Sequence, residues 1–192
     1  KYLGRCVNGE LIAAIAMTEP SAGSDIQGTK TSAVLEGDHY VLNGSKTFIT
    51  NGLKAGLVIV AAKTDVSAGS MGISLFLLED GMVGFTKGKK LQKLGLKAQD
   101  TAELFFQDVK VPQENLLGEV GCGFIYLMQN LPQERLTIAV GANGMCQSVL
   151  QATVDYTKER KAFGTNVAAF QNPQFKLAEM AAEILSAEVF LD

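Results

Sequence analysis

Residues 16–25, with the sequence AMTEPSAGSD, gather group types that can bind a flat polar heterocycle. They follow an apolar run that predicts a buried strand, and they are rich in hydroxyls, glycine and backbone amides. Such a loop can hydrogen-bond the edge of a heterocycle and place Ser24 beside a phosphate or a carbonyl. Taken alone, the same residues favour an ordinary strand-to-loop turn that stops at a proline.

Two further segments are equally ambiguous when each is taken alone. Residues 43–52, NGSKTFITNG, combine an aromatic side chain with hydroxyls and are best explained singly as an ordinary strand. Residues 158–164, KERKAFG, place Arg160 at the end of a predicted helix, where a positive charge also stabilises the last carbonyl groups. Gln171 follows eight residues after Phe163.

Together and in this order, the three segments resemble the signatures of the acyl-CoA dehydrogenase family. The first resembles T-E-P-x-A-G-S-D, the second N-G-x-K-x-[W/F]-I-[T/S]-N-G, and the third R-x-x-F-G followed by a glutamine. The resemblance extends over almost the whole chain, including the GLK run at 95–97 and the DTA run at 100–102. The pattern is most similar to that of the long-chain and isovaleryl members.

The resemblance implies that the protein binds FAD. In that family the aromatic residue of the second signature packs on the isoalloxazine, and the hydroxyl residue faces flavin N5, so these roles pass to Phe48 and Thr50. Arg160 and Gln171 would reach the adenosine diphosphate part of a flavin held by a neighbouring subunit. The full set of implied cofactor contacts is Ile15, Met17, Thr18, Gly23, Ser24, Phe48, Ile49, Thr50, Arg160, Phe163 and Gln171.

The resemblance also places a catalytic base at Glu134, within the run LPQERL at residues 131–136. Removing a proton α to a thioester requires a carboxylate whose pKa is raised by a dry pocket, while hydride leaves Cβ for flavin N5. Long-chain and isovaleryl members carry the base at this position, whereas medium- and short-chain members take it from a later loop. The alternative is that Glu134 only serves the first turn of a helix, with the base beyond Asp192.

Substrate contacts follow from the same resemblance. Arg135 corresponds to the residue near the CoA moiety, Pro132 and Gln133 line the same region in long-chain relatives, and Ser24 is expected to touch the substrate as well. Ile125 stands where a long-chain homologue has a tyrosine, so that contact is not expected here.

A β-rich first half must position the first two segments. Short apolar and β-branched runs, separated by Gly, Asn and Asp, predict strands at 11–17, 32–35, 40–42, 47–50, 57–62, 73–78 and 102–106. The EGD run at 36–38 and the Asn43-Gly44 pair are expected to form tight turns, because Gly and Asn tolerate positive φ. This spacing predicts an antiparallel barrel or sandwich of about a hundred residues.

After Pro112 the periodicity becomes helical and continues up to Arg160. Asn130 followed by Pro132 predicts the start of this helix, since proline fits a first turn. A second helix is expected to open at Asn172-Pro173. It is apolar on most faces and must pack among other helices, so the chain is expected to be a piece of a longer protein.

The composition narrows the class of protein. With 192 residues, 47% of them hydrophobic, the chain can form a real core. A net charge of -3 argues against a nucleic-acid or anionic-membrane surface. The lysines at 87–97 predict a solvated edge strand, with contact to an acidic ligand or partner as the alternative. Three separated cysteines predict reduced thiols, and the lone His39 predicts a surface turn rather than a metal ligand. A soluble protein without an integral membrane segment is expected.

These observations predict an α+β fold. An antiparallel β-barrel or sandwich domain at 1–118 would supply flavin and acyl-CoA contacts, and 119–192 would begin an up-down helical bundle. The resemblance implies an oxidoreductase of fatty acid β-oxidation that converts an acyl-CoA to trans-2-enoyl-CoA and passes electrons to an electron-transfer flavoprotein. It also implies a homotetramer, in the cytoplasm of a bacterium or the mitochondrial matrix of a eukaryote.

Two alternatives remain at the level of sequence. An acyl-CoA oxidase-like flavoenzyme would share these motifs, because the distinction lies in oxygen access. A non-catalytic fragment of such an enzyme would bind flavin poorly or only within an assembly.

Overall fold

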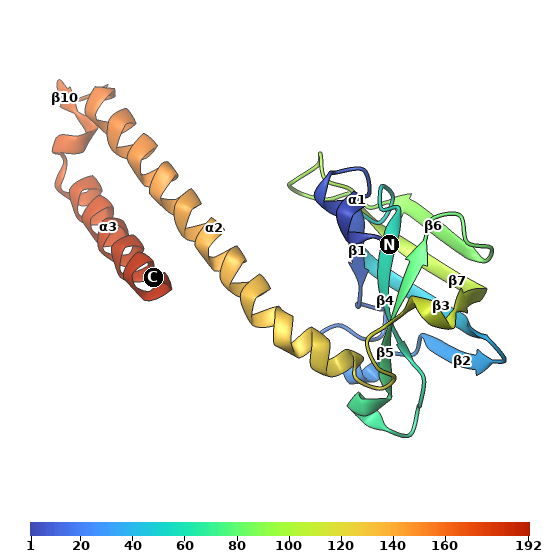
Figure 1. Ribbon diagram of the computed structural model, residues 1–192. Helices are drawn as coiled ribbons and strands as arrows, with labels where there is room; N and C mark the ends of the chain where they lie inside the picture. The colour runs from blue at the N-terminus through green and yellow to red at the C-terminus, as the bar shows by residue number, and fades with distance from the viewer. The chain divides into compact units, whose positions relative to one another are not determined.

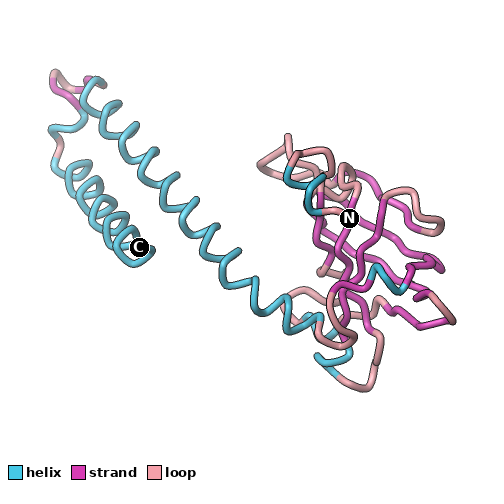
Figure 2. The backbone as a smooth tube through the Cα atoms, in the orientation of Figure 1, coloured by secondary structure: helices cyan, strands magenta, loops and turns pink.

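The computed structural model describes residues 1–192 as two compact units, 1–127 and 128–192. The first unit consists mainly of strands, and the second consists of helices joined by a short hairpin (Figure 1, Figure 2). The fold class is therefore α+β, as the sequence predicts.

The first unit is built on one eight-stranded sheet that is mostly antiparallel. Its order is β6-β7-β3-β2-β4-β5-β8, and β1 pairs in parallel with β4. The strands are β1 Ala13–Ala16, β2 Ser32–Glu36, β3 His39–Thr50, β4 Leu57–Lys63, β5 Ile73–Glu79, β6 Phe85–Lys90, β7 Thr101–Pro112 and β8 Leu116–Leu117. Short helices complete the unit: α1 Leu3–Val7, η1 Ile26–Gly28, η2 Gly69–Gly72 and η3 Gln113–Asn115.

The hydrophobic core lies against β3, β4, β5 and β7. Most positions of β4 are buried, which fits an apolar strand covered on both of its faces. Tyr40 meets the Phe76 ring edge-on, with ring centroids 4.9 Å apart, and Phe85 stacks on Phe106 at 5.3 Å. This core holds β1 and β3 on a rigid sheet.

One predicted turn is confirmed and another is wrong. Glu36 pairs with His39 in a hairpin whose loop residue Gly37 has a φ of 63°. Asn43-Gly44, by contrast, lies inside the continuous strand β3. A Cβ on Gly44 would lie 2.5 Å from the Thr31 hydroxyl oxygen, so the glycine is required by close packing rather than by a turn.

The first part of the basic stretch, Lys87–Lys90, lies in β6, which is an edge strand as predicted, and Lys93 and Lys97 lie in the loop that follows. Its lysines are not simply solvated. The Lys87 ammonium donates to the Ala55 carbonyl at 2.7 Å and pairs with Asp80 at 3.0 Å. Lys90 and Lys93 also donate to backbone carbonyls, at Lys97 and Gln99. These hydrogen bonds stabilise the loop between β6 and β7.

The first long helix, α2, spans Gly123–Glu159, so the predicted start at Asn130 is wrong. Its first turn lies against β5, where a Cβ on Gly123 would be 2.9 Å from the Ile73 carbonyl oxygen. Pro132 lies inside the helix, where its missing amide removes one helical hydrogen bond. Pro132, which the sequence predicts to mark the start of the helix, instead lies in the interior of α2 and interrupts its backbone hydrogen bonds.

The second long helix, α3, spans Gln171–Leu191, as the sequence predicts. Between α2 and α3 lie the hairpin strands β9 Lys161–Ala162 and β10 Thr165–Asn166, and η4 Val167–Ala169. No residue of α3 is buried, and Phe190 is 91% exposed, because its apolar faces have few partners within this chain. None of the helices is both long and apolar enough to span a membrane.

Candidate active site

A pocket of about 310 Å³ lies beside the ends of β1 and β3 in the first unit. This pocket, called here the β1–β3 pocket, is lined by backbone and side chains of two segments that are about thirty residues apart in the sequence. They are Ala13, Ala14, Ile15, Met17, Thr18, Phe48, Ile49, Thr50 and Asn51. The lining is mainly apolar with a few hydroxyl and amide groups, which suits a flat ring with polar edges.

Direct hydrogen bonds hold the two segments of the β1–β3 pocket together. The Thr47 amide donates to the Thr18 carbonyl at 2.9 Å, and the Asn51 side chain reaches the Ala13 carbonyl at 3.5 Å. The small residues Ala14 and Ala16 are buried where β1 packs parallel to β4. The pairing of β1 with β4 therefore fixes one wall of the pocket, and the C-terminal end of β3 forms the other.

A β-bulge turns Phe48 toward this pocket. In the pairing of β3 with β7, the register shifts between Lys46 and Ile49, so two residues of β3 oppose one residue of β7. Phe48 adopts a φ of 58°, which is rare for an aromatic residue, and 67% of it is exposed. Such strain at an exposed aromatic residue is typical of a ligand-binding position.

A buried ion pair lies beneath both segments, and neither of its members is among the predicted site residues. The Lys46 ammonium lies 2.9 Å from a Glu19 carboxylate oxygen, and their side chains are 0% and 3% exposed. Lys46 also donates to the Met17 carbonyl at 2.9 Å, while Glu19 accepts hydrogen bonds from the Lys30 and Thr31 amides. Both residues occupy fixed positions of the first two signatures, T-E-P and N-G-x-K, which is the signal that could have identified them.

The environment shifts the pKa of both members of this pair. Burial alone raises the pKa of the Glu19 carboxyl, but hydrogen bonds from Thr31, Lys30 and Lys46 outweigh burial and hold the pKa below its ordinary value. Burial lowers the pKa of the Lys46 ammonium, and the nearby Glu19 offsets this only in part. The environment therefore favours the ionised form of the Glu19 carboxyl.

The structure brings together most of the predicted cofactor contacts of the first unit. Ile15, Met17, Thr18, Phe48, Ile49 and Thr50 all line the β1–β3 pocket. Gly23 and Ser24 are exposed and do not line it. The reason is a tight turn, in which the Glu19 amide donates to the Ala22 carbonyl and the Ala22 amide donates back to Glu19. This turn reverses the chain before Ser24.

The predicted contacts of the second unit cluster at the hairpin between α2 and α3. Phe163 and Gly164 have φ values of 53° and 80° and join Ala162 to Thr165, as in a type I′ turn. Phe163 is 98% exposed and touches Phe170 edge-on. Arg160 precedes this hairpin and Gln171 begins α3, so three predicted contacts surround one exposed turn.

The predicted base and substrate contacts lie on α2. Pro132, Gln133, Glu134 and Arg135 are exposed, about three turns after the helix begins at Gly123. Ile138 and Met145 follow Glu134 at helical spacings of four and eleven and are 73% and 71% exposed. Glu134 is thus in line with an exposed apolar stripe on the helix.

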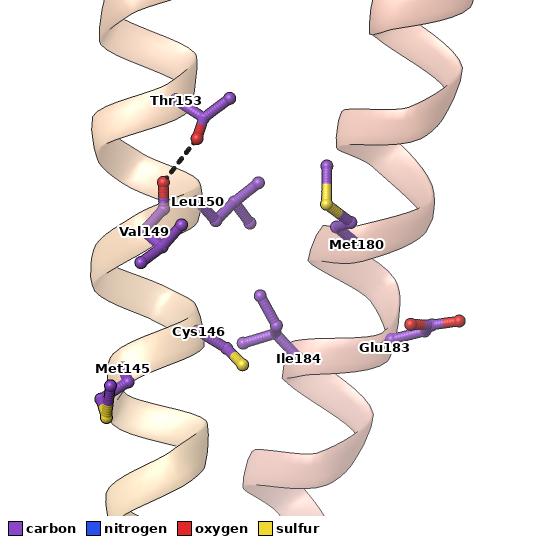
Figure 3. A pocket seen from close by; sticks show the side chains of 8 residues that line it. All are labelled: Met145, Cys146, Val149, Leu150, Thr153, Met180, Glu183 and Ile184. Atoms are coloured by element: carbon purple, nitrogen blue, oxygen red, sulfur yellow. Dashed lines mark hydrogen bonds between the residues drawn. The ribbon is translucent and has the colours of Figure 1, made fainter. Parts of the chain in front are cut away.

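The second unit also contains an apolar pocket of about 370 Å³ between α2 and α3. Figure 3 shows Cys146 and Leu150 pointing from α2 toward α3, and Ile184 pointing from α3 toward α2. No predicted site residue lines this pocket. Its lining is that of a helix-packing surface and offers no convergent polar groups.

Comparison with protein families decides what this arrangement belongs to. Residues 14–109 match the family described as acyl-CoA dehydrogenase, middle domain, and residues 121–191 match acyl-CoA dehydrogenase, C-terminal domain. The chain belongs to the acyl-CoA dehydrogenase family.

Named acyl-CoA dehydrogenases are similar to this chain over its whole length. The mitochondrial long-chain specific acyl-CoA dehydrogenase of Mus musculus is 55% identical over 194 residues, which cover 100% of this chain and 45% of that protein. Mitochondrial isovaleryl-CoA dehydrogenase of Pongo abelii is 45% identical, again over 100% of this chain and 46% of the relative. The chain therefore spans about half the length of these relatives.

Solved acyl-CoA dehydrogenase structures share the fold. The crystal structure of acyl-CoA dehydrogenase from Geobacillus kaustophilus is 56% identical, with a TM-score of 0.97 over 99% of this chain and 50% of that chain. A more distant structure, described as PigA with FAD and proline, is 33% identical with a TM-score of 0.96 over 99% of this chain and 50% of the other.

The β1–β3 pocket fits the ring of the flavin that acyl-CoA dehydrogenases carry. Its volume of about 310 Å³ is at the lower end of the usual range for ligand sites, so it can take a ring system but not a whole dinucleotide. Phe48 offers an exposed aromatic face, and Thr18 and Thr50 offer hydroxyls at its edge. The residues present fit the flavin ring, and the rest of the cofactor requires other contacts.

Proposed function

We propose that this protein is an FAD-dependent acyl-CoA dehydrogenase that converts an acyl-CoA thioester to trans-2-enoyl-CoA. The observation that carries the proposal is the β1–β3 pocket, where the two signature segments meet through the bond from the Thr47 amide to the Thr18 carbonyl. Membership of the family and the names of its close relatives support the same reaction. A solved relative described with FAD supports the choice of flavin.

In this proposal, residues of the first unit bind the flavin and a residue of α2 transfers the proton. Bound FAD supplies the acceptor for the hydride that leaves Cβ. Phe48 packs against the ring, while Met17, Thr18 and Thr50 bind its edge, and Ile15 and Ile49 complete the wall. Gly23 and Ser24, on the exposed part of the loop, extend the cofactor contacts beyond the pocket, and Ser24 also contacts the substrate.

Glu134 is the proposed base that takes the α-proton of the thioester. Glu134 does not serve the first turn of a helix, because α2 begins at Gly123, about three turns earlier. A base beyond Asp192 stays the alternative to Glu134. The apolar stripe through Ile138 supports a dry environment for this carboxylate when substrate is bound. Arg135 contacts the CoA moiety, with Pro132 and Gln133 in the same region.

The exposed hairpin after α2 is proposed to complete the cofactor site of a second subunit. Arg160, Phe163 and Gln171 would contact the adenosine diphosphate part of FAD there, in a homotetramer. Support comes from Phe163, which the hairpin presents almost fully to solvent despite its aromatic ring. The boundary between the flavin-binding domain, 1–118, and the helical domain, 119–192, is part of the same proposal.

The reduced enzyme is proposed to pass its electrons to an electron-transfer flavoprotein. A solved neighbour is described as an electron transferring flavoprotein of Acidaminococcus fermentans, at 47% identity and a TM-score of 0.94 over 99% of this chain and 50% of that one. The relatives from Mus musculus and Pongo abelii are named as mitochondrial enzymes, which supports the mitochondrial matrix if this protein is eukaryotic. A relative from the bacterium Megasphaera elsdenii is consistent with the cytoplasm if it is bacterial.

The test is an activity assay on the full-length protein with acyl-CoA substrates of several chain lengths. Flavin absorbance in the blue, dye reduction that depends on acyl-CoA, and little hydrogen peroxide are the expected results. Stoichiometric hydrogen peroxide would instead identify an oxidase. A protein without flavin or turnover would contradict both enzymatic assignments.

A further inference from the structure

The buried pair of Glu19 and Lys46 does not touch the space of the β1–β3 pocket, yet it lies directly behind its lining. Glu19 follows Met17 and Thr18, and Lys46 precedes Phe48 by two residues. Burying two charges is costly, and a pair of apolar residues would often serve stability as well. The pair therefore calls for an explanation beyond stability.

The contacts of the pair hold both segments of the pocket at once. The Lys46 ammonium bonds to the Glu19 carboxylate and to the Met17 carbonyl, both at 2.9 Å. The Glu19 carboxylate accepts from the Lys30 amide at 2.7 Å and the Thr31 amide at 3.0 Å. Two side chains thus join the loop, the start of β2 and the strand β3.

The pair is also coupled to the bulge that presents Phe48. Lys46 is the last regularly paired residue before the register shift, and both Lys46 and Thr47 are buried while Phe48 is exposed. A positive φ at a bulky residue persists only where the surroundings over-determine it. The anchored Lys46 side chain on one side and the buried Ile49 on the other supply that constraint.

We propose that Glu19 and Lys46 are positioning residues for the flavin, which set the separation between the Met17-Thr18 edge and the Phe48 ring before the cofactor binds. This inference rests on the proposed function, because it takes the ligand of the β1–β3 pocket to be FAD. Outer residues that orient a binding wall typically control its affinity as strongly as some direct contacts do.

Lys46→Met is the direct test, and Lys63→Met is its matched control. Lys63 is also a buried lysine of the same sheet, at 8% exposure, but its ammonium bonds to the Gly69 carbonyl and it lies outside the pocket lining. Each variant removes one buried ammonium from the first unit. A general loss of stability should therefore appear in both, whereas a loss of flavin positioning should appear only in Lys46→Met.

The measurements are FAD affinity of the full-length apoprotein and the visible circular dichroism of the flavin that remains bound. Lys46→Met is expected to weaken FAD binding about tenfold or more and to change the circular dichroism, while Lys63→Met changes neither. If Lys46→Met does not fold, Glu19→Gln, which keeps the side-chain volume, takes its place under the same criteria.

The outcomes separate this inference from the proposed function. Wild-type protein that binds no FAD overturns the proposed function. Wild-type protein that binds FAD, together with a Lys46→Met variant of unchanged affinity and circular dichroism, overturns only the positioning role. Equal losses in Lys46→Met and Lys63→Met also overturn it, since they reduce the effect to stability.

Discussion

The Nζ atom of Lys46 lies 2.9 Å from an Oε atom of Glu19, and both side chains are almost completely buried. The two residues belong to two different sequence signatures, so this contact joins the signatures in space. Around it the loop and the strand meet at a pocket whose lining fits a flavin ring.

Acid is expected to weaken this junction through Glu19. Its folded-state pKa lies below the ordinary value of 4.5, so its stabilising effect is complete above pH 4.5 and is lost as the pH falls through the folded-state pKa. Glu19→Gln should lower the free energy of unfolding by about 3 to 5 kcal/mol at neutral pH, because it breaks a buried pair. The difference from wild type should shrink below pH 4.5 in urea unfolding. The exposed Glu36→Gln is the control and should leave the free energy of unfolding at neutral pH almost unchanged. A pH-independent difference between Glu19→Gln and wild type would contradict the stabilising role of the Glu19 carboxylate.

Phe48→Gly separates backbone strain from ligand contact. Glycine accepts the φ of 58° without strain, and the ring is 67% exposed, so the free energy of unfolding should change by no more than about 1 kcal/mol. FAD affinity should fall roughly three- to tenfold, as expected for a lost aromatic contact. Phe76→Ala, in the core, should instead cost about 3 to 5 kcal/mol. Unchanged FAD binding in Phe48→Gly would remove Phe48 from the site.

Phe163→Asn tests the exposed hairpin in a similar way. Asparagine followed by Gly164 is the preferred pair for a type I′ turn, so the hairpin should keep or gain stability. FAD titration of the assembled protein should nevertheless show weaker binding, because the aromatic contact is gone. Phe163→Tyr should bind normally. Equal affinity for all three proteins would argue that the hairpin does not touch the cofactor.

Glu134→Gln should abolish turnover and leave the flavin in place. Loss of a general base typically costs about 10² to 10⁴ in kcat. Glu179→Gln, which removes an exposed acid paired with Lys176, is the matched control and should keep full activity. Steady-state kinetics and the flavin spectrum of each variant give the answer. Normal turnover in Glu134→Gln would place the base elsewhere.

The sequence predicts elements well where local pattern and packing agree. Strands β4 and β5 follow from their apolar runs almost to the residue. The turn predicted at Asn43-Gly44 is wrong, because Gly44 lies inside β3 and is required for close packing against Thr31. The helix start predicted near Pro132 is also wrong. The helix α2 begins at Gly123, which packs closely against β5, and it continues through Pro132.

The sequence predicts the residues that line the β1–β3 pocket, but it does not predict the buried ion pair behind them. The resemblance identifies Met17, Thr18, Phe48 and Thr50, which do share one pocket. It gives no role to Glu19 or Lys46, because charged residues are usually expected at the surface and their burial depends on long-range pairing. Exposure of Ser24 follows from the turn between Glu19 and Ala22, which agrees with the ordinary turn that residues 16–25 favour when taken alone.

The most direct test of the central claim is an anaerobic titration of the full-length protein with acyl-CoA, followed by flavin absorbance. The proposed function predicts that the blue absorbance bleaches in proportion to the acyl-CoA added and that enoyl-CoA appears in equal amount. Flavin that stays oxidised at saturating acyl-CoA of every chain length would contradict it.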